Sequence, residues 1–442
     1  MKRMILFISL LFFAQIAFAQ VSTIWEKSKA KNTFPSGFMG TAHTERGFAT
    51  GKVTLNPFEK LMERSEIAKN YPSYLGTANT DRGFAYGVSN NVEKLYIVGR
   101  KLANNIFIVN PATGDSLSKL DVTGISGGAI ALNDVEVSAD GYVYACNVTT
   151  NASTSAFKVY KWDSDASAPK VAISYTGTAL RYGDKFTVTG STADNSITVW
   201  AASAASNKVV KFTSTDKGET FASSEITLTG ANNGSSPAVY PSNDGSKLYL
   251  NSNGTLVKEY SATGTFLGEI PGSIIGTGSN SLRYFEVDGK KFLAVYAYGI
   301  GNENIRVVEI TDGLSSAKLV GATTSMYFRA NANGTGEIAI KNNGNKTYTL
   351  FVLGTNNGIA SYKVIPTNYG SFQRMYLVSR LNTTKIIVMD AANGDSLKIL
   401  NLAGIAGGTF TLNDVEVAVS GEIFACNLTT NASTSPFKIY KW

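Results

Sequence analysis

The sequence predicts an all-β protein built as a β-propeller of four-stranded blades, and three observations carry that prediction. Short runs of β-branched and aromatic residues alternate apolar and polar side chains along most of the chain, as half-buried strands do. Glycine is abundant, with 42 residues, and turn signals such as Asp140-Gly141 and Asp288-Gly289 separate the runs. Grouped by fours, the runs form about six sets of roughly 40 to 55 residues, the size of a propeller blade.

The first residues have the pattern of a secretory signal. Lys2 and Arg3 precede the apolar run 4–13, and Ala-Phe-Ala at 17–19 forms a small-residue cleavage site. The apolar run is shorter than the roughly 20 residues that a membrane-spanning helix needs. We therefore expect a signal peptide over 1–19, export to the periplasm, the cell surface or the medium, and no membrane insertion after cleavage.

An N-terminal segment, 20–75, precedes the first complete set of strands. It carries a partial duplicate of the module's beginning, because GTAHTERGFATG at 40–51 matches GTANTDRGFAYG at 76–87. Only the stretch EKLMERSEIAKN, at 59–70, has a helical composition. We expect the propeller itself to span 76–365.

The sets of strands then follow in order along the chain. The first holds RGFAYGV, KLYIVGR, NIFIVNP and SLSKLDV, and the second holds LNDVEVS, YVYACNV, FKVYKWD and PKVAISY. The third holds DKFTVTG, ITVWAAS, KVVKFTS and SSEITLT, and looser sets continue to about Val364. Each set has the four strands that one blade requires.

Residues 371–442 duplicate the first two blades. Asn133 and Asn413 are 280 residues apart, and so are Trp162 and Trp442. Six blades of about 47 residues fit that offset, as expected when a duplication respects folding units. Two structures remain open: a six-bladed ring followed by a two-blade tail, or one ring of up to eight blades. In the larger ring, an N-terminal stretch such as FATGKVTL would supply the outer strand that the tail lacks.

Composition excludes several classes of function. The net charge of +7 falls to +5 when Lys2 and Arg3 are removed, and the basic residues form no stripe, so nucleic acid is not an expected partner. His43 is the single histidine, which argues against a Ser-His-Asp triad or a His-rich zinc site. Cys146 and Cys426 occupy equivalent positions in the two copies, so we expect two buried free thiols.

Two resemblances to known families concern the fold. LYIVGR, NIFIVNPATGDSLSKL and NDVEVSADGYVYACN resemble the secreted YVTN-type and lactonase-like β-propellers. WEKS, RGFAYG and NLTTNASTSPFKIYKW are similar to an uncharacterised family of exported proteins of Bacteroidetes-like bacteria. Ser214 to Phe221, STDKGETF, resembles a single Asp-box, which implies a structural hairpin turn between outer strands.

A third resemblance concerns a metal. Asn133, Asp134, Val137 and Gly141 match the NDxxVxxxG segment of calcium-dependent gluconolactonase-like propellers, which implies Asn133 and Asp184 as Ca²⁺ ligands. The first blade departs from that family, because Arg82 stands near the position of the expected carboxylate. Most of that family's other oxygen ligands are missing, and the residues themselves favour Asn133 and Asp134 as caps of a turn at the strand entry.

A propeller places ligands at one mouth of its central channel, among residues that begin the innermost strands. The candidates are Arg82, Asn133, Asp134, Arg181, Asp184, Arg283, Glu286 and Glu337. They mix both charges and suit a small polar ligand or a loop of a partner. The main hypothesis is a secreted, non-catalytic binding or scaffold propeller without a cofactor, recognising a glycan, a peptide or a surface protein. The alternatives are a calcium-dependent lactonase-like hydrolase and a structural surface protein, and the oligomeric state is left open.

Overall fold

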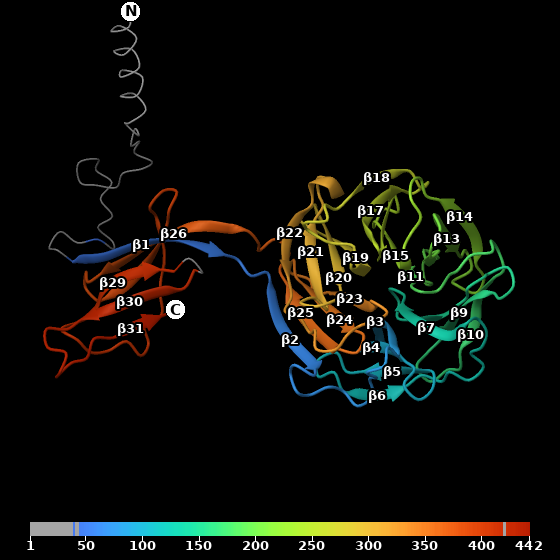
Figure 1. Cartoon of the computed structure of the whole chain (residues 1–442), viewed down its shortest axis with the longest axis horizontal. Coiled ribbons are helices and arrows are strands. Elements are labelled where there is room, and N and C mark those ends of the chain that lie inside the picture. The colour runs from blue at the N-terminus through green and yellow to red at the C-terminus, as the bar shows by residue number, and fades with distance from the viewer. Residues whose placement is uncertain (1–38, 40–43, 419–420) are drawn as a thin grey trace, which may run out of the picture. The chain divides into compact units, whose positions relative to one another are not determined.

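The computed structural model describes residue 39 and residues 44–418 and 421–442, and the expected signal peptide lies outside them. The chain divides into two compact units (Figure 1). One unit is Asn56–Tyr369, called the propeller below. The other combines the described residues up to Leu55 with those of Gly370–Trp442, and is called the two-blade unit. No helix in the described residues is long and apolar enough to cross a membrane.

The propeller consists of six four-stranded antiparallel sheets, and five of them are continuous in sequence. Blade one is β3 (Asp81–Ser89), β4 (Val92–Gly99), β5 (Asn105–Val109) and β6 (Ser116–Lys119). Blade two is β7 (Ile130–Val137), β8 (Val143–Val148), β9 (Phe157–Trp162) and β10 (Lys170–Tyr175). Blade three is β11 (Thr187–Thr189), β12 (Thr198–Ala202), β13 (Lys208–Thr213) and β14 (Ala222–Thr227). Blade four is β15 (Ser235–Pro241), β16 (Lys247–Asn253), β17 (Thr255–Ser261) and β18 (Phe266–Glu269). Blade five is β19 (Ser279–Val287), β20 (Lys290–Ala297), β21 (Asn304–Glu309) and β22 (Lys318–Ala322), with a short 3-10 helix, η1 (Leu314–Ser316), before β22.

Blade six closes the ring by joining both ends of the propeller. Its inner strands are β23 (Gly336–Asn342), β24 (Tyr348–Gly354) and β25 (Gly358–Val364), and its outermost strand is β2 (Phe58–Ser65). β2 pairs antiparallel with β25, from Phe58 opposite Val364 to Ser65 opposite Gly358. The helical composition of 59–70 is therefore overridden, because the open edge of β25 offers this segment a ladder of backbone hydrogen bonds.

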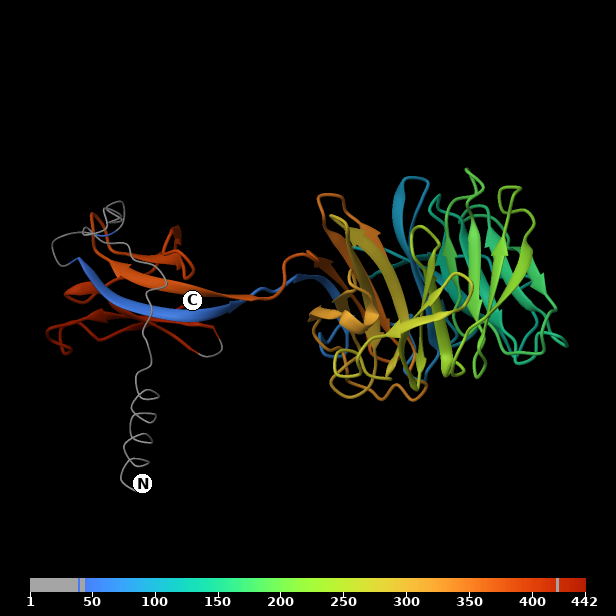
Figure 2. The ribbon, with the colours of Figure 1, turned by 90° about the horizontal axis from the view of Figure 1, so that it is seen from above.

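The innermost strands β3, β7, β11, β15, β19 and β23 contact their neighbours in that order, and β23 contacts β3 again. Figure 1 shows them facing a common centre, and Figure 2 shows the same ring turned by 90°. The ring therefore has six blades, and the eight-bladed alternative is wrong. Apolar side chains fill the spaces between adjacent blades: Tyr96, Val143 and Trp162 lie between blades one and two, with at most 1% of each exposed.

The two-blade unit is assembled from both ends of the chain. β1 (Glu45–Thr54) pairs with β26 (Ser371–Ser379), which continues into β27 (Lys385–Asp390) and β28 (Ser396–Ile399). The second sheet has three strands, β29 (Phe410–Val417), β30 (Ile423–Leu428) and β31 (Ile439–Lys441). The stretch FATGKVTL thus supplies the innermost strand of a blade-one copy, where the sequence suggested the outer strand of the last blade.

The two copies of the module's beginning each serve one blade-one sheet. A Cβ placed on Gly83 of β3 would lie 2.4 Å from the backbone nitrogen of Val135, and one on Gly47 of β1 would lie 2.5 Å from that of Val415. Only glycine permits these close approaches of innermost strands. A glycine at the same position of the innermost strand therefore lets blade one pack closely on blade two in the propeller, and lets their copies pack closely in the two-blade unit.

Two local predictions can be compared with the described residues. Cys146 and Cys426 are both free thiols, as expected, but the expected burial holds only for Cys146 and is wrong for Cys426, which is partly exposed. The Asp-box-like segment turns between β13 and β14: the carboxylate of Asp216 accepts hydrogen bonds from the hydroxyl of Ser214, at 2.7 Å, and from the backbone nitrogen of Thr220, at 2.9 Å. That segment stabilises a turn, as the resemblance implied.

Candidate binding site at the mouth of the propeller channel

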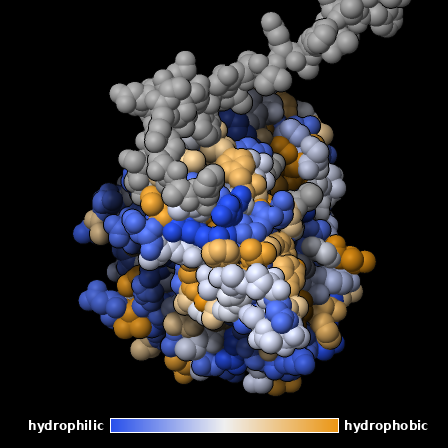
Figure 3. All heavy atoms as spheres, turned by 90° about the vertical axis from the view of Figure 1, so that its left-hand side faces the viewer, coloured by the Kyte–Doolittle hydropathy of each residue, from blue (hydrophilic) through white to orange (hydrophobic). Residues whose placement is uncertain are grey.

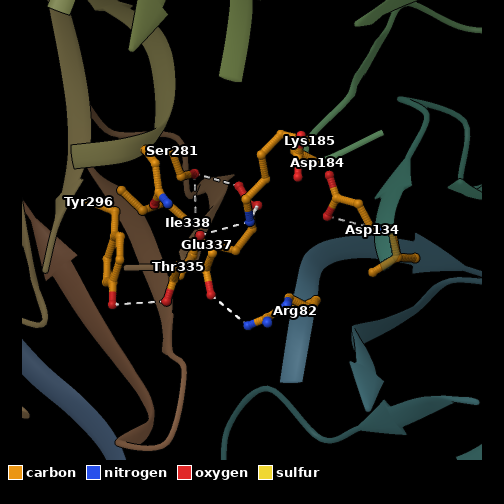
Figure 4. A network of polar contacts seen from close by, with 12 residues as sticks. Arg82, Asp134, Asp184, Lys185, Ser281, Tyr296, Thr335, Glu337 and Ile338 are labelled. Carbon is orange, nitrogen blue, oxygen red and sulfur yellow. Dashed lines mark hydrogen bonds and ion pairs between the residues drawn. The ribbon is translucent and has the colours of Figure 1, made fainter. Parts of the chain in front are cut away.

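A cavity of about 410 Å³ opens where the innermost strands begin. We call it the mouth cavity, and its lining comes from the beginnings of blades one, two, three, four and six: Arg82, Ile130, Asn133, Arg181, Asp184, Lys185, Ser235, Ser236, Ala332, Asn333 and Thr335. All innermost strands run in the same direction through a propeller, so residues far apart in sequence meet at this end. Figure 4 shows several of these side chains converging from different blades.

The rim of the mouth cavity carries one tight ion pair. The guanidinium of Arg181 binds the carboxylate of Asp184 through two contacts, Nε to Oδ2 at 2.7 Å and Nη2 to Oδ1 at 2.5 Å. This bidentate contact raises the pKa of Arg181, although burial opposes the shift. Because the two charges balance each other, this pair shapes the rim without adding net charge to it.

Asn133 joins blade two to blade three below that rim. Its Nδ2 donates to the backbone carbonyls of Gly183, at 2.9 Å, and Asp184, at 3.0 Å. Its Oδ1 accepts a hydrogen bond from Nη1 of Arg100, at 3.3 Å. The amide therefore already has partners on both sides, and one of them is a cation.

Arg82, which lines the mouth cavity, and Arg100, which contacts Asn133 of that lining, carry charges without an ion-pair partner in the described residues. Arg82 Nη1 donates to the hydroxyl of Thr335 at 2.7 Å, and neither arginine forms an ion pair with a carboxylate in the described part of the chain. Burial, and then the neighbouring Arg100, lower the pKa of Arg82 to about 10, so that it stays charged at neutral pH. Burial also lowers the pKa of Arg100, while Asp81 opposes that shift. Two partly desolvated cations thus lie close together here.

A buried charged network lies next to the mouth cavity. Lys185 donates to the backbone carbonyl of Gly336, at 2.8 Å, and forms an ion pair with Glu337. Glu337 also accepts a hydrogen bond from Ser281 and lies 3.5 Å from Arg283. These contacts connect blades three, five and six across the axis (Figure 4).

Blades two and four add to the same network. Arg283 forms an ion pair with Glu136 of β7, at 2.6 Å, and its guanidinium carbon lies 5.4 Å from the ring centre of Tyr240 of β15. Burial raises the pKa of Glu136, and Arg283 opposes that shift. For the Arg283 guanidinium, burial alone would lower the pKa, but Glu136 and Glu337 outweigh it and raise it. The mouth cavity therefore adjoins a buried ionic network that draws on five blades.

Asp134 is part of this interior and does not line the mouth cavity. Its Oδ2 accepts a hydrogen bond from the backbone nitrogen of Phe186, at 3.0 Å, which connects β7 to the beginning of blade three. Burial raises its pKa to about 7, and the nearby Glu337 adds to the shift. Only 1% of Asp134 is exposed, and its hydrogen bond with Phe186 holds blade two against blade three.

The structure thus divides the eight candidate residues. Arg82, Asn133, Arg181 and Asp184 line the mouth cavity, whereas Asp134, Arg283 and Glu337 lie next to it in the network. Glu286 belongs to neither group, and its placement at the mouth is wrong. It lies near the end of β19, about 17 Å along the strand from Ser281 at 3.3 Å per residue. There it accepts a hydrogen bond from Tyr284.

Sequence reasoning missed Lys185, Arg100 and Thr335. Lys185 directly follows Asp184, and a lysine at the start of an otherwise apolar innermost strand was the available signal. Arg100 ends the run KLYIVGR, where the second strand returns to the mouth. Nothing local in the sequence marks Thr335.

The residues present do not fit the calcium site that the gluconolactonase-like resemblance implied. Ca²⁺ requires six to eight oxygen ligands. Arg100 donates to the side-chain oxygen of Asn133, and Arg181 binds both carboxylate oxygens of Asp184. In the described residues, no group of three or more acidic, histidine or cysteine side chains could hold a metal. We therefore derive no chemical step through calcium.

A second cavity, of about 550 Å³, lies where the innermost strands of blades two to four end. Its lining includes Val137, Thr189, Trp200, Lys211, Tyr240 and Ser242. Trp200 is 3% exposed, and Lys211 lies 4.8 Å from its ring centre, so the indole packs in the blade and offers no free face to a sugar. The mouth cavity differs from this larger one in having two neighbouring, partly buried arginines, whereas the cation of the larger cavity, Lys211, lies over an indole ring.

Comparison with known proteins adds the fold but no activity. Residues 110–326 match DUF4623, a domain of unknown function. A DUF4623 family protein from Bacteroides eggerthii is 15% identical, with a TM-score of 0.55 over 74% of this chain and 84% of that one. A protein of unknown function from Bacteroides thetaiotaomicron is 14% identical, with a TM-score of 0.43 over 72% and 76%. The allergen Mala s 1 of Malassezia sympodialis is 13% identical, with a TM-score of 0.40 over 66% and 93%. No curated protein matches the chain at a significant level.

Proposed function

We propose that this chain is an exported, non-catalytic propeller that binds a negatively charged group of a glycan or peptide in the mouth cavity. One observation carries the proposal: Arg82 lines the mouth cavity, Arg100 contacts Asn133 of its lining, and neither partly buried arginine forms an ion pair with a carboxylate in the described residues, although the Asp81 charge acts on both. Keeping two such cations desolvated costs free energy. A carboxylate or sulfate between them would offset that cost through short, charge-assisted hydrogen bonds.

The other ionisable groups around the cavity already have partners, which supports binding over hydrolysis. Asp184 is bound by Arg181, and Glu337 by Lys185 and Arg283. A general acid or base must exchange a proton with a substrate, and these carboxylates are held in ion pairs instead. The volume of about 410 Å³ suits a small ligand or the charged end of a larger one.

The test is calorimetric titration with anionic and neutral probes. D-glucuronate, D-galacturonate, N-acetylneuraminate and an acetylated glutamate dipeptide are the anionic probes, and D-glucose and D-galactose are the neutral ones. At least one anionic probe is expected to bind, with an affinity that falls as salt is added. Equal binding of a neutral sugar, or no binding of any anionic probe at millimolar concentration, contradicts the proposal.

The duplication provides matched control variants. Arg82→Gln and Arg100→Gln remove the two arginine charges, and each is expected to weaken binding about 10- to 100-fold. Arg46 and Arg380 occupy the equivalent positions in the two-blade unit, and Arg380 contacts Asn413 as Arg100 contacts Asn133. Arg46→Gln and Arg380→Gln should leave the affinity unchanged. A loss of affinity in those variants would move the site out of the propeller.

A further inference from the structure

The three-stranded sheet of the two-blade unit repeats blade two at a constant offset of 280 residues. Phe437, Ile439 and Cys426 are the copies of Phe157, Val159 and Cys146. In both sheets these side chains point to the same face, because strands alternate their side chains with a period of two. The face of blade two that carries Cys146, Phe157 and Val159 is therefore present a second time, in the two-blade unit.

Only one of the two faces is covered. In the propeller, blade three packs on it through Phe186, Val188 and Phe212, and Phe157 and Val159 are 0% exposed. In the two-blade unit, Phe437 is 57% exposed and Ile439 is 63% exposed. The uncovered face holds a hollow of about 220 Å³, lined by Val415, Phe424, Ala425, Cys426, Phe437 and Ile439. On the face drawn in Figure 3, apolar side chains lie between hydrophilic ones.

The polar groups that hold blade three are duplicated as well. In the propeller, Asp134 accepts from the backbone nitrogen of Phe186, and Asn133 donates to the carbonyls of Gly183 and Asp184. Thr149 forms a two-way backbone bridge with Tyr182. These contacts hold the loop that leads into blade three.

Their copies lack these partners. Asp414 is exposed, and in the described residues its carboxylate accepts only from its neighbour Val415, at 2.9 Å. Asn413 accepts a hydrogen bond from Arg380, while its Nδ2 donates to no described residue. The two-blade unit thus presents the apolar and polar parts of a blade-three docking surface, except for the part that β10 contributes through Ile173 in the propeller.

We propose that the face of β29, β30 and β31 is a docking surface for a blade-three-type sheet supplied from outside the described residues. That sheet has an apolar antiparallel face of aromatic and β-branched residues, preceded by a glycine-containing loop. The loop offers a backbone N–H to Asp414 and backbone carbonyls to Asn413. The propeller displays the same pairing between its own blades two and three, with 0% exposure of the central side chains.

Two arguments exclude a second copy of this chain as the occupant. The blade three of a second copy is already packed on its own blade two. Two copies of the uncovered face would place one sheet face against the other, and neither copy would bring the loop that leads into blade three, whose backbone meets the copy of Asp414 in the propeller. Edge-to-edge pairing through β31 is opposed by Lys438 and Lys441, because charged residues on an edge strand resist pairing.

The experiment extends the full chain after Trp442 with its own residues, as they follow Trp162 in the propeller. The long extension repeats residues 163–228 and supplies β10 and blade three. The short extension repeats residues 163–175 and supplies only β10, which completes the sheet edge without covering the face. Reaction of Cys426 with a thiol reagent reports the covering, and the buried Cys146 serves as an internal reference.

The long extension is expected to slow the reaction of Cys426 at least about tenfold, and the short one to change it less than about threefold. Hydrogen exchange at residues 423–428 should slow in parallel. Ile439→Lys within the long-extension chain should restore the fast reaction, because it places a charge in the covered face.

An unchanged Cys426 rate in the long-extension chain overturns the proposal, whether the added segment stays unfolded or folds elsewhere. So does a dimer of the unextended chain that Ile439→Lys dissociates, because a second copy would then be the occupant. Analytical ultracentrifugation over a range of concentrations detects that dimer.

Discussion

Blade two and its copy in the two-blade unit are nearly the same sequence in two environments. Val159 is 0% exposed in the propeller, whereas its copy Ile439 is 63% exposed. Glu136 is buried in an ion pair with Arg283, whereas its copy Glu416 is exposed. A strand pattern determines which side chains share a face, but the neighbouring blade determines whether that face is a core, a network or a surface.

The two copies should differ most in how much free energy of unfolding is lost when the equivalent phenylalanine is replaced by alanine. Phe157→Ala leaves a cavity between blades two and three, and should lower the propeller's free energy of unfolding by about 3–5 kcal/mol. Phe437→Ala removes a side chain that is mostly in water and should cost less than about 1 kcal/mol. Urea unfolding followed by hydrogen exchange in each unit measures both costs. Equal costs would mean that the copy's face is covered in solution.

A second difference concerns the buried network. Glu136→Ala leaves Arg283 buried with Glu337 at 3.5 Å as its remaining carboxylate partner, and should destabilise the propeller by about 3 kcal/mol. Glu416→Ala changes an exposed side chain and should stay within about 0.5 kcal/mol of the unmodified chain. Thermal unfolding of the two variants provides the comparison. A mild effect of Glu136→Ala would show that water enters the channel.

The propeller should also lose stability as the pH rises from about 4 to about 7. Burial raises the pKa of Asp134 to about 7 and also raises that of Asp81 to about 7, so the folded chain holds protons that the unfolded chain releases. Their stabilising contribution is complete below the unfolded pKa and is lost as the pH passes the folded one. Each group adds a slope of up to about 1.4 kcal/mol per pH unit.

Asp134→Asn should reduce that slope, and Asp414→Asn, its counterpart in the two-blade unit, should not. The measurement is urea unfolding of the propeller at pH 5 and pH 8. A propeller that is more stable at pH 8 would mean that Asp134 and Asp81 are ionised in the folded state.

The two thiols of the unmodified chain should react at different rates with a thiol reagent, because they differ in burial. Cys146 is buried, and its surroundings raise its pKa, so it should resist thiol reagents until the propeller unfolds. Cys426 is partly exposed and should react at least about 100-fold faster in the native protein. Mass spectrometry of the modified peptides identifies which thiol reacted. Comparable rates would contradict the burial of Cys146.

The smallest expected effect is that of calcium. Asn133 and its copy Asn413 both accept a hydrogen bond from an arginine, so neither unit presents its amide oxygen to a metal. The melting temperature should therefore be the same in EDTA and in excess Ca²⁺. A site filled at 100 times its Kd would add about 2.7 kcal/mol of stability, and such a rise would favour the lactonase-like alternative.

Much of the site could be predicted from the sequence, because strand order brings the beginnings of the innermost strands together. Arg82, Asn133, Arg181 and Asp184 were found in this way, and they line the mouth cavity. Glu286 was misplaced, because its distance along β19 depends on where that strand begins. Lys185 and Arg100 were missed, because their roles depend on Glu337 and Asn133, which lie on other blades.

The sequence by itself determined the strands, their grouping into blades and the offset of 280 residues, because alternation and turn chemistry act over a few neighbouring residues. Only the tertiary structure decided which sheet each N-terminal strand joins. β2 joins β25 despite a helical composition, and β1 joins β26, because these pairings fill sheet edges formed more than 290 residues later in the chain. Which copy of a face becomes buried was likewise decided in three dimensions, since burial depends on a neighbouring blade that no local pattern encodes.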